Sequence, residues 1–177
     1  MENPNDIILV NETDEVTGYG EKMEVHRKGL LHRAFSVLVF NDKGETLLQR
    51  RAFEKYHSPG LWTNTCCSHP MPHETTQEAA LRRLQEEMGF TCKVEHIGKF
   101  HYTAEFDNGL TENEMDHVFI GFFNSEPVPN PVEVCETRWI SVPDLVFWMQ
   151  TSPDEFTVWF RIIAENVFVD GKMVSKI

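Results

Sequence analysis

The stretch from Thr75 to Gly89 constrains the fold most, because it carries a start signal, an apolar stripe and a stop signal for one helix. Thr75 and Glu78 have the spacing of a capping box, in which each side chain bonds the backbone of the other residue. Gly89 stands where a helix often ends in the left-handed conformation. The stripe between them has helical spacing and consists of Ala80, Leu81, Leu84 and Met88.

The residues before and after this helix are typical of strands. His32–Phe40 is rich in β-branched and aromatic side chains, and Asn41 to Gly44 separate it from Glu45–Arg51, which predicts a hairpin with a four-residue connection. Similar segments predict further strands near residues 7–10, 94–102, 116–123 and 135–140.

Two Ser and Pro pairs near the C-terminus predict two more helices, starting at Ser141 with Pro143 and at Ser152 with Pro153. The second helix has an apolar face of Phe156, Trp159, Phe160, Ile163 and Val167. Together the elements predict an α+β fold with a mixed or antiparallel sheet and helices packed against it. No repeat or linker divides residues 1–177, so we expect a single domain.

Cysteine usage and the N-terminal residues favour a cytoplasmic protein. Cys66, Cys67, Cys92 and Cys135 lack zinc-site spacing, and adjacent cysteines are poor disulfide partners. The apolar run at residues 7–10 is too short for a signal peptide or a membrane span.

The net charge of −12 limits the partners that the chain can bind. An acidic surface repels nucleic acid and anionic membranes, so we expect neither as a partner. A small anionic substrate would need a local basic patch, a divalent cation or both. We expect the chain to be a monomer or a weak homodimer.

Chemically reactive side chains are concentrated in two separate segments. Residues 62–70 (WTNTCCSHP) hold adjacent thiols and an imidazole, and residues 112–114 (ENE) hold two carboxylates. Residues two apart on a strand point to the same face, so Glu112 and Glu114 can converge on one ion. A thiol that acts as acid or base needs a tuned pKa, which an imidazole and a metal nearby would provide. Buried packing for the cysteines and a solvated strand edge for the glutamates are the alternatives.

The charges of the predicted helix are spaced four apart, as Arg82 with Glu86 and Arg83 with Glu87. This spacing by itself indicates surface ion pairs. However, residues 68–90 resemble the Nudix box, with Ser68 in place of its Gly and Arg83 in place of the first Glu of its Arg-Glu pair. In hydrolytic members the carboxylates of the box assemble a metal cluster that activates water. An arginine there removes a ligand and adds a phosphate-binding group, which favours binding of a diphosphate without its hydrolysis.

Residues 7 to about 167 closely resemble the type 1 isopentenyl diphosphate isomerases, a branch of the Nudix fold. The motifs that carry the resemblance are residues 31–36 (LHRAFS), 49–51 (QRR), 59–70 (PGLWTNTCCSHP), 112–114 (ENE) and 159–160 (WF). The resemblance implies a Nudix-like sheet sandwiched by helices. It also implies the reversible 1,3-allylic isomerisation of isopentenyl diphosphate to dimethylallyl diphosphate, which feeds isoprenoid biosynthesis.

The resemblance assigns two metal ions and a diphosphate site. The residues matching the metal site are His26, His32, His69, Glu112 and Glu114, with Cys67 beside them. Manganese, zinc and magnesium all suit such ligands. Glu87 matches a ligand of a Mg²⁺ that arrives with the substrate. The residues matching diphosphate contacts are Lys22, Arg51, Lys55 and Arg83. By sequence alone His32 opens a strand, whereas His26 is expected in a charged loop.

The implied chemistry needs an acid, a base and a partner for a carbocation. Cys67 and Glu114 match the groups on the two sides of the allylic unit, one adding a proton and the other removing one. Tyr102 matches a residue that hydrogen-bonds Glu114, and Trp159 matches an indole whose face stabilises the cation. Tyr102 as a half-buried strand residue and Trp159 as core are the simpler alternatives.

Two other functions compete with this one. A Nudix pyrophosphohydrolase of a nucleoside or prenyl diphosphate would leave Cys67 and Trp159 unexplained, and Ser68 and Arg83 argue against it. A catalytically silent phosphate-binding module would bind diphosphates without exchanging protons.

Overall fold

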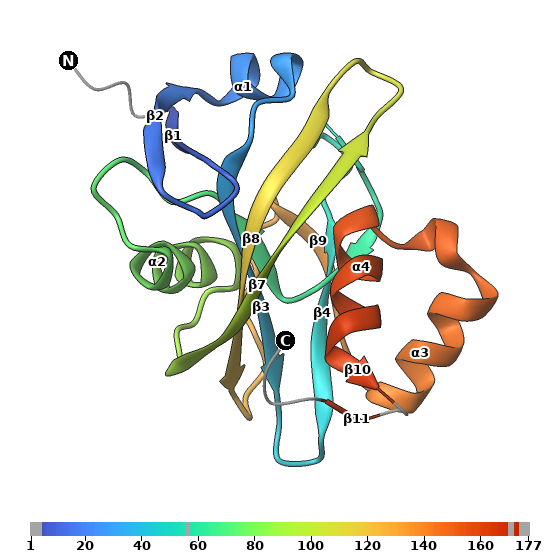
Figure 1. Ribbon diagram of the computed structural model, residues 1–177. Helices are drawn as coiled ribbons and strands as arrows, with labels where there is room; N and C mark the ends of the chain where they lie inside the picture. The colour runs from blue at the N-terminus through green and yellow to red at the C-terminus, as the bar shows by residue number, and fades with distance from the viewer. Residues whose placement is uncertain (1–4, 56, 170–171, 174–177) are drawn as a thin grey trace.

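The computed structural model describes residues 5–55, 57–169 and 172–173 (Figure 1). Nine of the described strands form one mixed sheet. These strands are β1 Asp6–Val10, β2 Val16–Glu21, β3 His32–Phe40, β4 Glu45–Arg51, β5 Trp62–Thr63, β6 Cys66–Ser68, β7 Val94–Glu105, β8 Thr111–Phe122 and β9 Val134–Ser141. The other elements are α1 Lys22–Lys28, α2 Thr76–Met88, α3 Val142–Thr151, the 3-10 helix η1 Pro153–Glu155, α4 Val158–Val167, and a small hairpin of β10 Phe168–Val169 and β11 Lys172–Met173.

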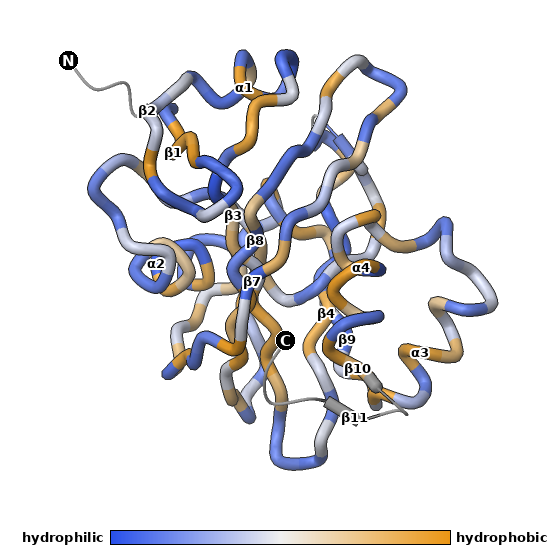
Figure 2. Tube along the Cα trace, in the orientation of Figure 1, coloured by the Kyte–Doolittle hydropathy of each residue, from blue (hydrophilic) through white to orange (hydrophobic). Residues whose placement is uncertain are grey.

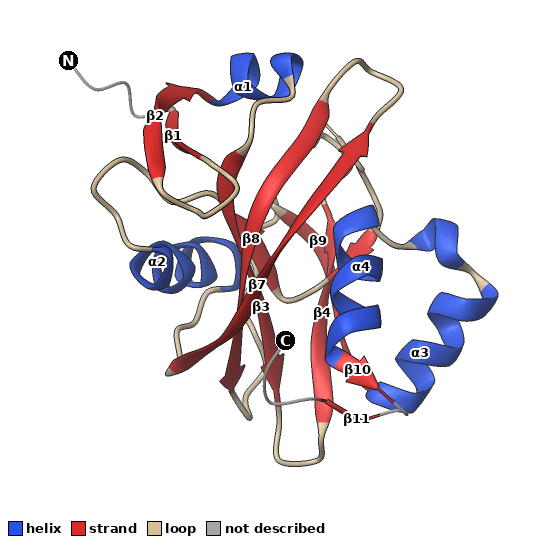
Figure 3. Cartoon of the chain, viewed as in Figure 1, coloured by secondary structure: helices blue, strands red, loops and turns tan. Residues whose placement is uncertain are grey.

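Helices lie on both faces of the sheet. Helix α2 covers one face, whereas α3 and α4 lie against the other (Figure 3). Each face has its own apolar cluster, one containing Leu84 and Met88 of α2 and the other Phe160 and Ile163 of α4. Figure 2 shows hydrophobic residues concentrated along β3, β4 and α4. The predicted α+β fold, with a mixed sheet between helices, is confirmed.

The predicted hairpin of β3 and β4 is present with its four-residue turn, but its strands soon diverge. Phe40 pairs with Thr46, and beyond this point residues 35–37 of β3 pair antiparallel with β6. Strand β3 also pairs in parallel with β8 along its whole length. The segment 62–68 fills the gap, because β5 pairs with β4 while β6 pairs with β3. The Thr65 hydroxyl connects the two strands, accepting from Val39 N at 2.9 Å and donating to Leu47 O at 2.6 Å. This divergence opens the sheet beside Cys67.

Helix α2 matches its prediction closely. Thr75 and Glu78 form the complete capping box, and Gly89 ends the helix in the left-handed region with φ of 74°. A Cβ at Gly89 would lie 2.2 Å from the carbonyl oxygen of Val128, so the position also needs glycine for space.

The predicted helix start at Ser152 and Pro153 is wrong. These residues begin only η1, and α4 starts at Val158. The chain stays extended at Phe156 because this residue forms a parallel bridge with Trp62, and Thr157 N donates to the carbonyl oxygen of Trp62 at 3.0 Å. Tertiary pairing with β5 thus delays the helix. The predicted start at Ser141 is confirmed, since its side chain caps α3.

The expected charged loop around His26 is also wrong, because residues 22–28 form α1 and His26 is fully buried. The helix has only seven residues and no extended apolar stripe, so periodicity does not reveal it. Glu21 caps its start, and Gly29 ends it with φ of 60°. The strand β2 before it was not predicted either.

Two further observations bear on the sequence predictions. Strand β8 begins at Thr111, earlier than the predicted residue 116, and therefore includes both Glu112 and Glu114. Within the part of the chain that the structure describes, no helix is long and apolar enough to cross a membrane.

Candidate active site

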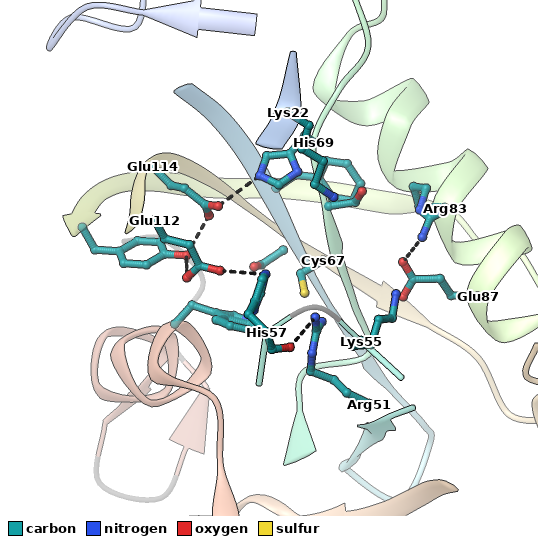
Figure 4. Close-up of a pocket in the computed structure, with 15 residues that line it drawn as sticks. Lys22, Arg51, Lys55, His57, Cys67, His69, Arg83, Glu87, Glu112 and Glu114 are labelled. Atoms are coloured by element: carbon teal, nitrogen blue, oxygen red, sulfur yellow. Dashed lines mark hydrogen bonds and ion pairs between the residues drawn. The ribbon is translucent and has the colours of Figure 1, made fainter. Parts of the chain in front are cut away.

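One pocket brings together every residue predicted to act in catalysis or to bind substrate (Figure 4). Its volume is about 60 Å³. The catalytic candidates that line it are Cys67, Tyr102, Glu114 and Trp159, and the substrate-binding candidates are Lys22, Arg51, Lys55 and Arg83. These side chains come from four strands, three helices and one connecting segment, so the pocket depends on the whole fold.

Three imidazoles and one carboxylate form a compact cluster beside the pocket. Ligand atoms of His26, His32, His69 and Glu114 all lie within 4.8 Å of one another. His32 opens β3 and pairs in register with Glu114 of β8, which fixes that pair. The Glu114 Oε1 atom lies 3.0 Å from His69 Nε2 and 3.4 Å from His32 Nε2.

Hydrogen bonds to backbone carbonyls orient two of these rings. Nδ1 of His26 lies 2.7 Å from the carbonyl oxygen of Lys22, and Nδ1 of His32 lies 2.8 Å from that of Leu30. If each Nδ1 carries the proton, each Nε2 presents its lone pair to the cluster, an arrangement common among metal-binding histidines.

Burial sets the charge of the cluster. It lowers the pKa of His26 to about 4 and the pKa of His69 to about 3, so both rings are neutral near pH 7. Burial alone would raise the pKa of Glu114, but its contacts with the rings of His32 and His69 hold that pKa well below its ordinary value. Neutral imidazoles with an ionised carboxylate suit a divalent metal ion.

Glu112 lies beside this cluster but points to different partners. Its Oε2 atom lies 3.0 Å from the hydroxyl of Tyr102, and its Oε1 atom lies 3.4 Å from Nε2 of His57. Burial and the charge of Glu114 raise its pKa well above the ordinary value. The Tyr102 hydroxyl also donates to Glu114 Oε2 at 2.7 Å, as predicted. Glu112 as a metal ligand stays a prediction.

The two adjacent cysteines face opposite sides of the sheet. Cys66 belongs to the apolar cluster beneath α2, whereas Cys67 lines the pocket. Burial raises the pKa of Cys67 to about 12, although the Arg51 guanidinium opposes this shift. Cys67 is therefore a thiol near neutral pH and has a proton to give.

The indole of Trp159 is both core and pocket wall. It is 3% exposed and belongs to the apolar cluster of α4. The guanidinium of Arg51 lies 5.2 Å from its ring centroid, and the ring of His57 meets it edge-on at 5.5 Å. A cation next to this ring is thus already part of the structure.

Positive side chains line the mouth of the pocket, at the end away from Trp159. Arg83 Nη2 lies 2.6 Å from Glu87 Oε1 and 3.3 Å from Glu133 Oε1, and Lys55 pairs with Glu133. Burial lowers the pKa of Lys22, and the charges of Arg83 and Arg51 lower it further. Cations that repel one another this closely would be stabilised by an anion.

Comparison with named relatives shows the family to which the chain belongs. The NUDIX domain family model matches residues 30–160. A protein named Isopentenyl-diphosphate Delta-isomerase from Burkholderia multivorans is 49% identical over 160 residues, covering 90% of this chain and 91% of the relative. Isopentenyl-diphosphate Delta-isomerase 2 from Photorhabdus laumondii is 48% identical over 161 residues, covering 91% of each chain. The chain belongs to the isopentenyl-diphosphate Delta-isomerase family.

Two solved structures of other proteins share the fold of this family member. A protein from Deinococcus radiodurans has a TM-score of 0.70 at 19% identity, covering 83% of this chain and 90% of that chain. The MutT protein from Methanosarcina mazei has a TM-score of 0.64 at 22% identity, covering 77% and 91%. At such low identity the likeness concerns the fold alone.

Sequence reasoning assigned no role to several polar residues in and around this pocket. Gln49 Nε2 donates to Glu87 Oε2 at 2.9 Å, Ser36 donates to Asp116 at 2.9 Å, and Glu133 joins Arg83 to Lys55. His57 lies just before the motif at residues 59–70. Ser36 and Gln49 belong to motifs that carry the resemblance, but residue spacing assigned them no role. The buried face shared by Glu112 and Glu114 continues to Asp116 and could have indicated it.

Proposed function

We propose that this pocket interconverts isopentenyl diphosphate and dimethylallyl diphosphate in isoprenoid biosynthesis, with Cys67 and Glu114 as the proton-transfer groups. Membership of the isomerase family supports the reaction. The observation that carries the residue assignment is the arrangement of a protonated thiol, an ionised carboxylate and an indole around one small cavity.

An unactivated alkene is a weak base, so its protonation needs a positioned acid and stabilisation of the resulting cation. A proton added to the terminal methylene leaves a tertiary carbocation at the branched carbon. Loss of a proton from the carbon on the diphosphate side then forms the new double bond. Cys67 and Glu114 serve these two steps and exchange roles in the reverse direction. Tyr102, which bonds Glu114, helps the carboxylate to pass a proton.

Trp159 supports the cation without trapping it. The face of an indole attracts positive charge, and a desolvated contact of this kind is worth about 2 kcal/mol or more. Burial of the ring also keeps out water, which would capture the carbocation as an alcohol.

The imidazole cluster is proposed to hold one divalent metal ion, Mn²⁺, Zn²⁺ or Mg²⁺, through His26, His32, His69 and Glu114, with Glu112 completing the set and Cys67 beside it. When bound, the ion would stabilise Glu114 as an anion and fix its position. Metal analysis of His69→Ala should show reduced occupancy, and a chelator should abolish activity. Full activity of the metal-free protein would contradict this site.

Lys22, Lys55 and Arg83 at the mouth of the pocket are proposed to hold the diphosphate, together with a Mg²⁺ contacted by Glu87. Arg51, which also packs against Trp159, is proposed to contact the diphosphate from inside the pocket. Arg83 occupies a position where hydrolytic Nudix boxes have a carboxylate, and it pairs with Glu87. A guanidinium there removes one metal ligand and adds a phosphate donor, which explains why a diphosphate would be held without being cut.

The decisive experiment is incubation of isopentenyl diphosphate with the protein and Mg²⁺ in deuterated water. Isomerisation with deuterium on carbon is the expected result, followed by nuclear magnetic resonance. Release of phosphate or pyrophosphate would instead favour a pyrophosphohydrolase. Binding without either reaction would favour a silent phosphate-binding module.

A further inference from the structure

His57 lies in the wall between the active pocket and a second cavity. The second cavity is an outer cleft of about 430 Å³, lined by residues that include Ser58, Pro59, Phe106, Phe156 and Arg161. Within residues 5–55, 57–169 and 172–173, His57 is the one residue that lines both spaces. The two cavities therefore adjoin at His57.

The surroundings of His57 hold this ring in place. It is 6% exposed and lies between Phe106, stacked at 5.2 Å, and Trp159, edge-on at 5.5 Å. Its Nε2 atom lies 3.4 Å from Glu112 Oε1, and its carbonyl oxygen accepts from Arg51 Nη2 at 3.2 Å. Packing on two faces and two polar contacts make His57 a fixed wall.

The wall stands at the end of the pocket that a hydrocarbon would occupy. Lys22, Lys55 and Arg83 lie at the mouth, and a larger space of about 490 Å³ opens there toward solvent. With the diphosphate held at these cations, as proposed above, the carbon chain would extend into the pocket that Trp159 and His57 line. The pocket volume of about 60 Å³ corresponds to roughly four waters, which suits a short branched unit.

We propose that His57 sets the chain length of the substrate by closing the inner end of the pocket. The inference rests on the proposed function, because it takes the diphosphate end as the fixed point. Without the imidazole, the pocket and the outer cleft would become continuous. A longer alkyl branch could then pass between Trp159 and Phe106 into a cleft that already has Phe156 and Pro59 in its lining.

The test compares two substrates in the full chain with Mg²⁺. One is isopentenyl diphosphate, and the other is a homologue with a hexyl group in place of its branch methyl. His57→Ala should raise the ratio of kcat/KM for the long substrate over the short one by at least about tenfold, the scale of discrimination that apolar pockets achieve. His57→Phe refills the wall and should keep the ratio of the unmutated protein. Asp154→Ala, in the outer cleft alone, should also leave the ratio unchanged.

A binding measurement tests the proposal in variants that no longer convert substrate. The saturated analogues of both substrates cannot isomerise, and calorimetry with them should show the same tenfold gain for the long chain in His57→Ala. His57→Val retains part of the packing and serves if His57→Ala does not fold. An unchanged ratio in both assays with folded His57→Val or His57→Ala would overturn the role of His57. Failure of the unmutated protein to isomerise the short substrate would contradict the proposed function.

Discussion

The two ends of the pocket are built from different kinds of interaction. At the inner end Tyr102, Glu114 and Trp159 are buried and Cys67 is half-buried, and packing and short hydrogen bonds hold this end in place. At the outer end Lys55 and Arg83 are held by ion pairs with carboxylates, one of them the partly exposed Glu133. An entering anion can exchange such ion pairs for its own, whereas the inner groups have no comparable freedom. The inner end should therefore govern turnover, and the outer end should govern affinity.

The strongest test of the inner end is the pair of adjacent cysteines. Cys67→Ser should lower kcat by about a thousandfold or more, because a hydroxyl is a much weaker acid than a thiol and general acid–base groups contribute on this scale. Cys66→Ser should be mild in kcat, since that side chain faces α2, although a hydroxyl in an apolar cluster will lower the melting temperature. Steady-state kinetics of both folded variants decides the matter. Equal losses would contradict the assignment of Cys67.

A smaller effect on turnover is expected at the indole. Trp159→Phe should lower kcat by about thirtyfold if the lost cation–π energy is about 2 kcal/mol. Trp148→Phe is the matched control, because Trp148 packs against Trp62 and Phe156 outside the pocket.

The melting temperature separates catalysis from packing in this experiment. A carbocation partner predicts loss of activity in Trp159→Phe at nearly unchanged melting temperature. A saturated diphosphate with an ammonium group at the position of the cation should also bind more tightly than substrate, and less so in Trp159→Phe. Activity that falls only in step with stability would leave Trp159 as core alone.

At the outer end the expected change is in KM. Arg83→Gln removes the guanidinium between Glu87 and Glu133, and it should raise KM about tenfold or more with a smaller change in kcat. Arg82→Gln is the control on the same helix, because Arg82 is paired with Glu74 and Glu86. A loss confined to kcat in Arg83→Gln would break the distinction between the two ends.

Local signals predicted the elements whose determinants are close in sequence. The capping box and Gly89 gave α2, and the Asn41 to Gly44 turn gave the β3 and β4 hairpin. The parallel pairing of β3 with β8 has no such local signal, because its strands are about 80 residues apart, as Ser36 and Asp116 illustrate. The late start of α4 was missed because a tertiary contact, the bridge between Trp62 and Phe156, determines it. The short helix α1 was missed because a cap determines it and it has no long apolar stripe.

Residue spacing alone predicted only some parts of the site. The shared face of Glu112 and Glu114 and the pair of Arg83 with Glu87 follow from strand and helix periods. The gathering of distant segments around Cys67 rested on the family resemblance. His57 had no signal, since its role comes from lying between two cavities.

The smallest expected effect is that of pH on the stability of the metal-free protein. Burial lowers the pKa of His26 to about 4 and that of His69 to about 3, whereas an unfolded histidine titrates near 6.5. Between these values the unfolded chain binds more protons than the folded one, so stability must fall as the pH falls. The loss should begin near pH 6.5 and end once the folded imidazoles titrate, and the melting temperature should drop by several degrees on the way. His69→Gln removes one of these groups and should flatten the decline, while His101→Gln, on an exposed position of β7, should leave its slope unchanged. If the melting temperature of His69→Gln depended on pH as steeply as that of the unmutated protein, burial would not be the reason that the imidazoles at the inner end are neutral. The contrast between a neutral inner end and a charged outer end would then be wrong.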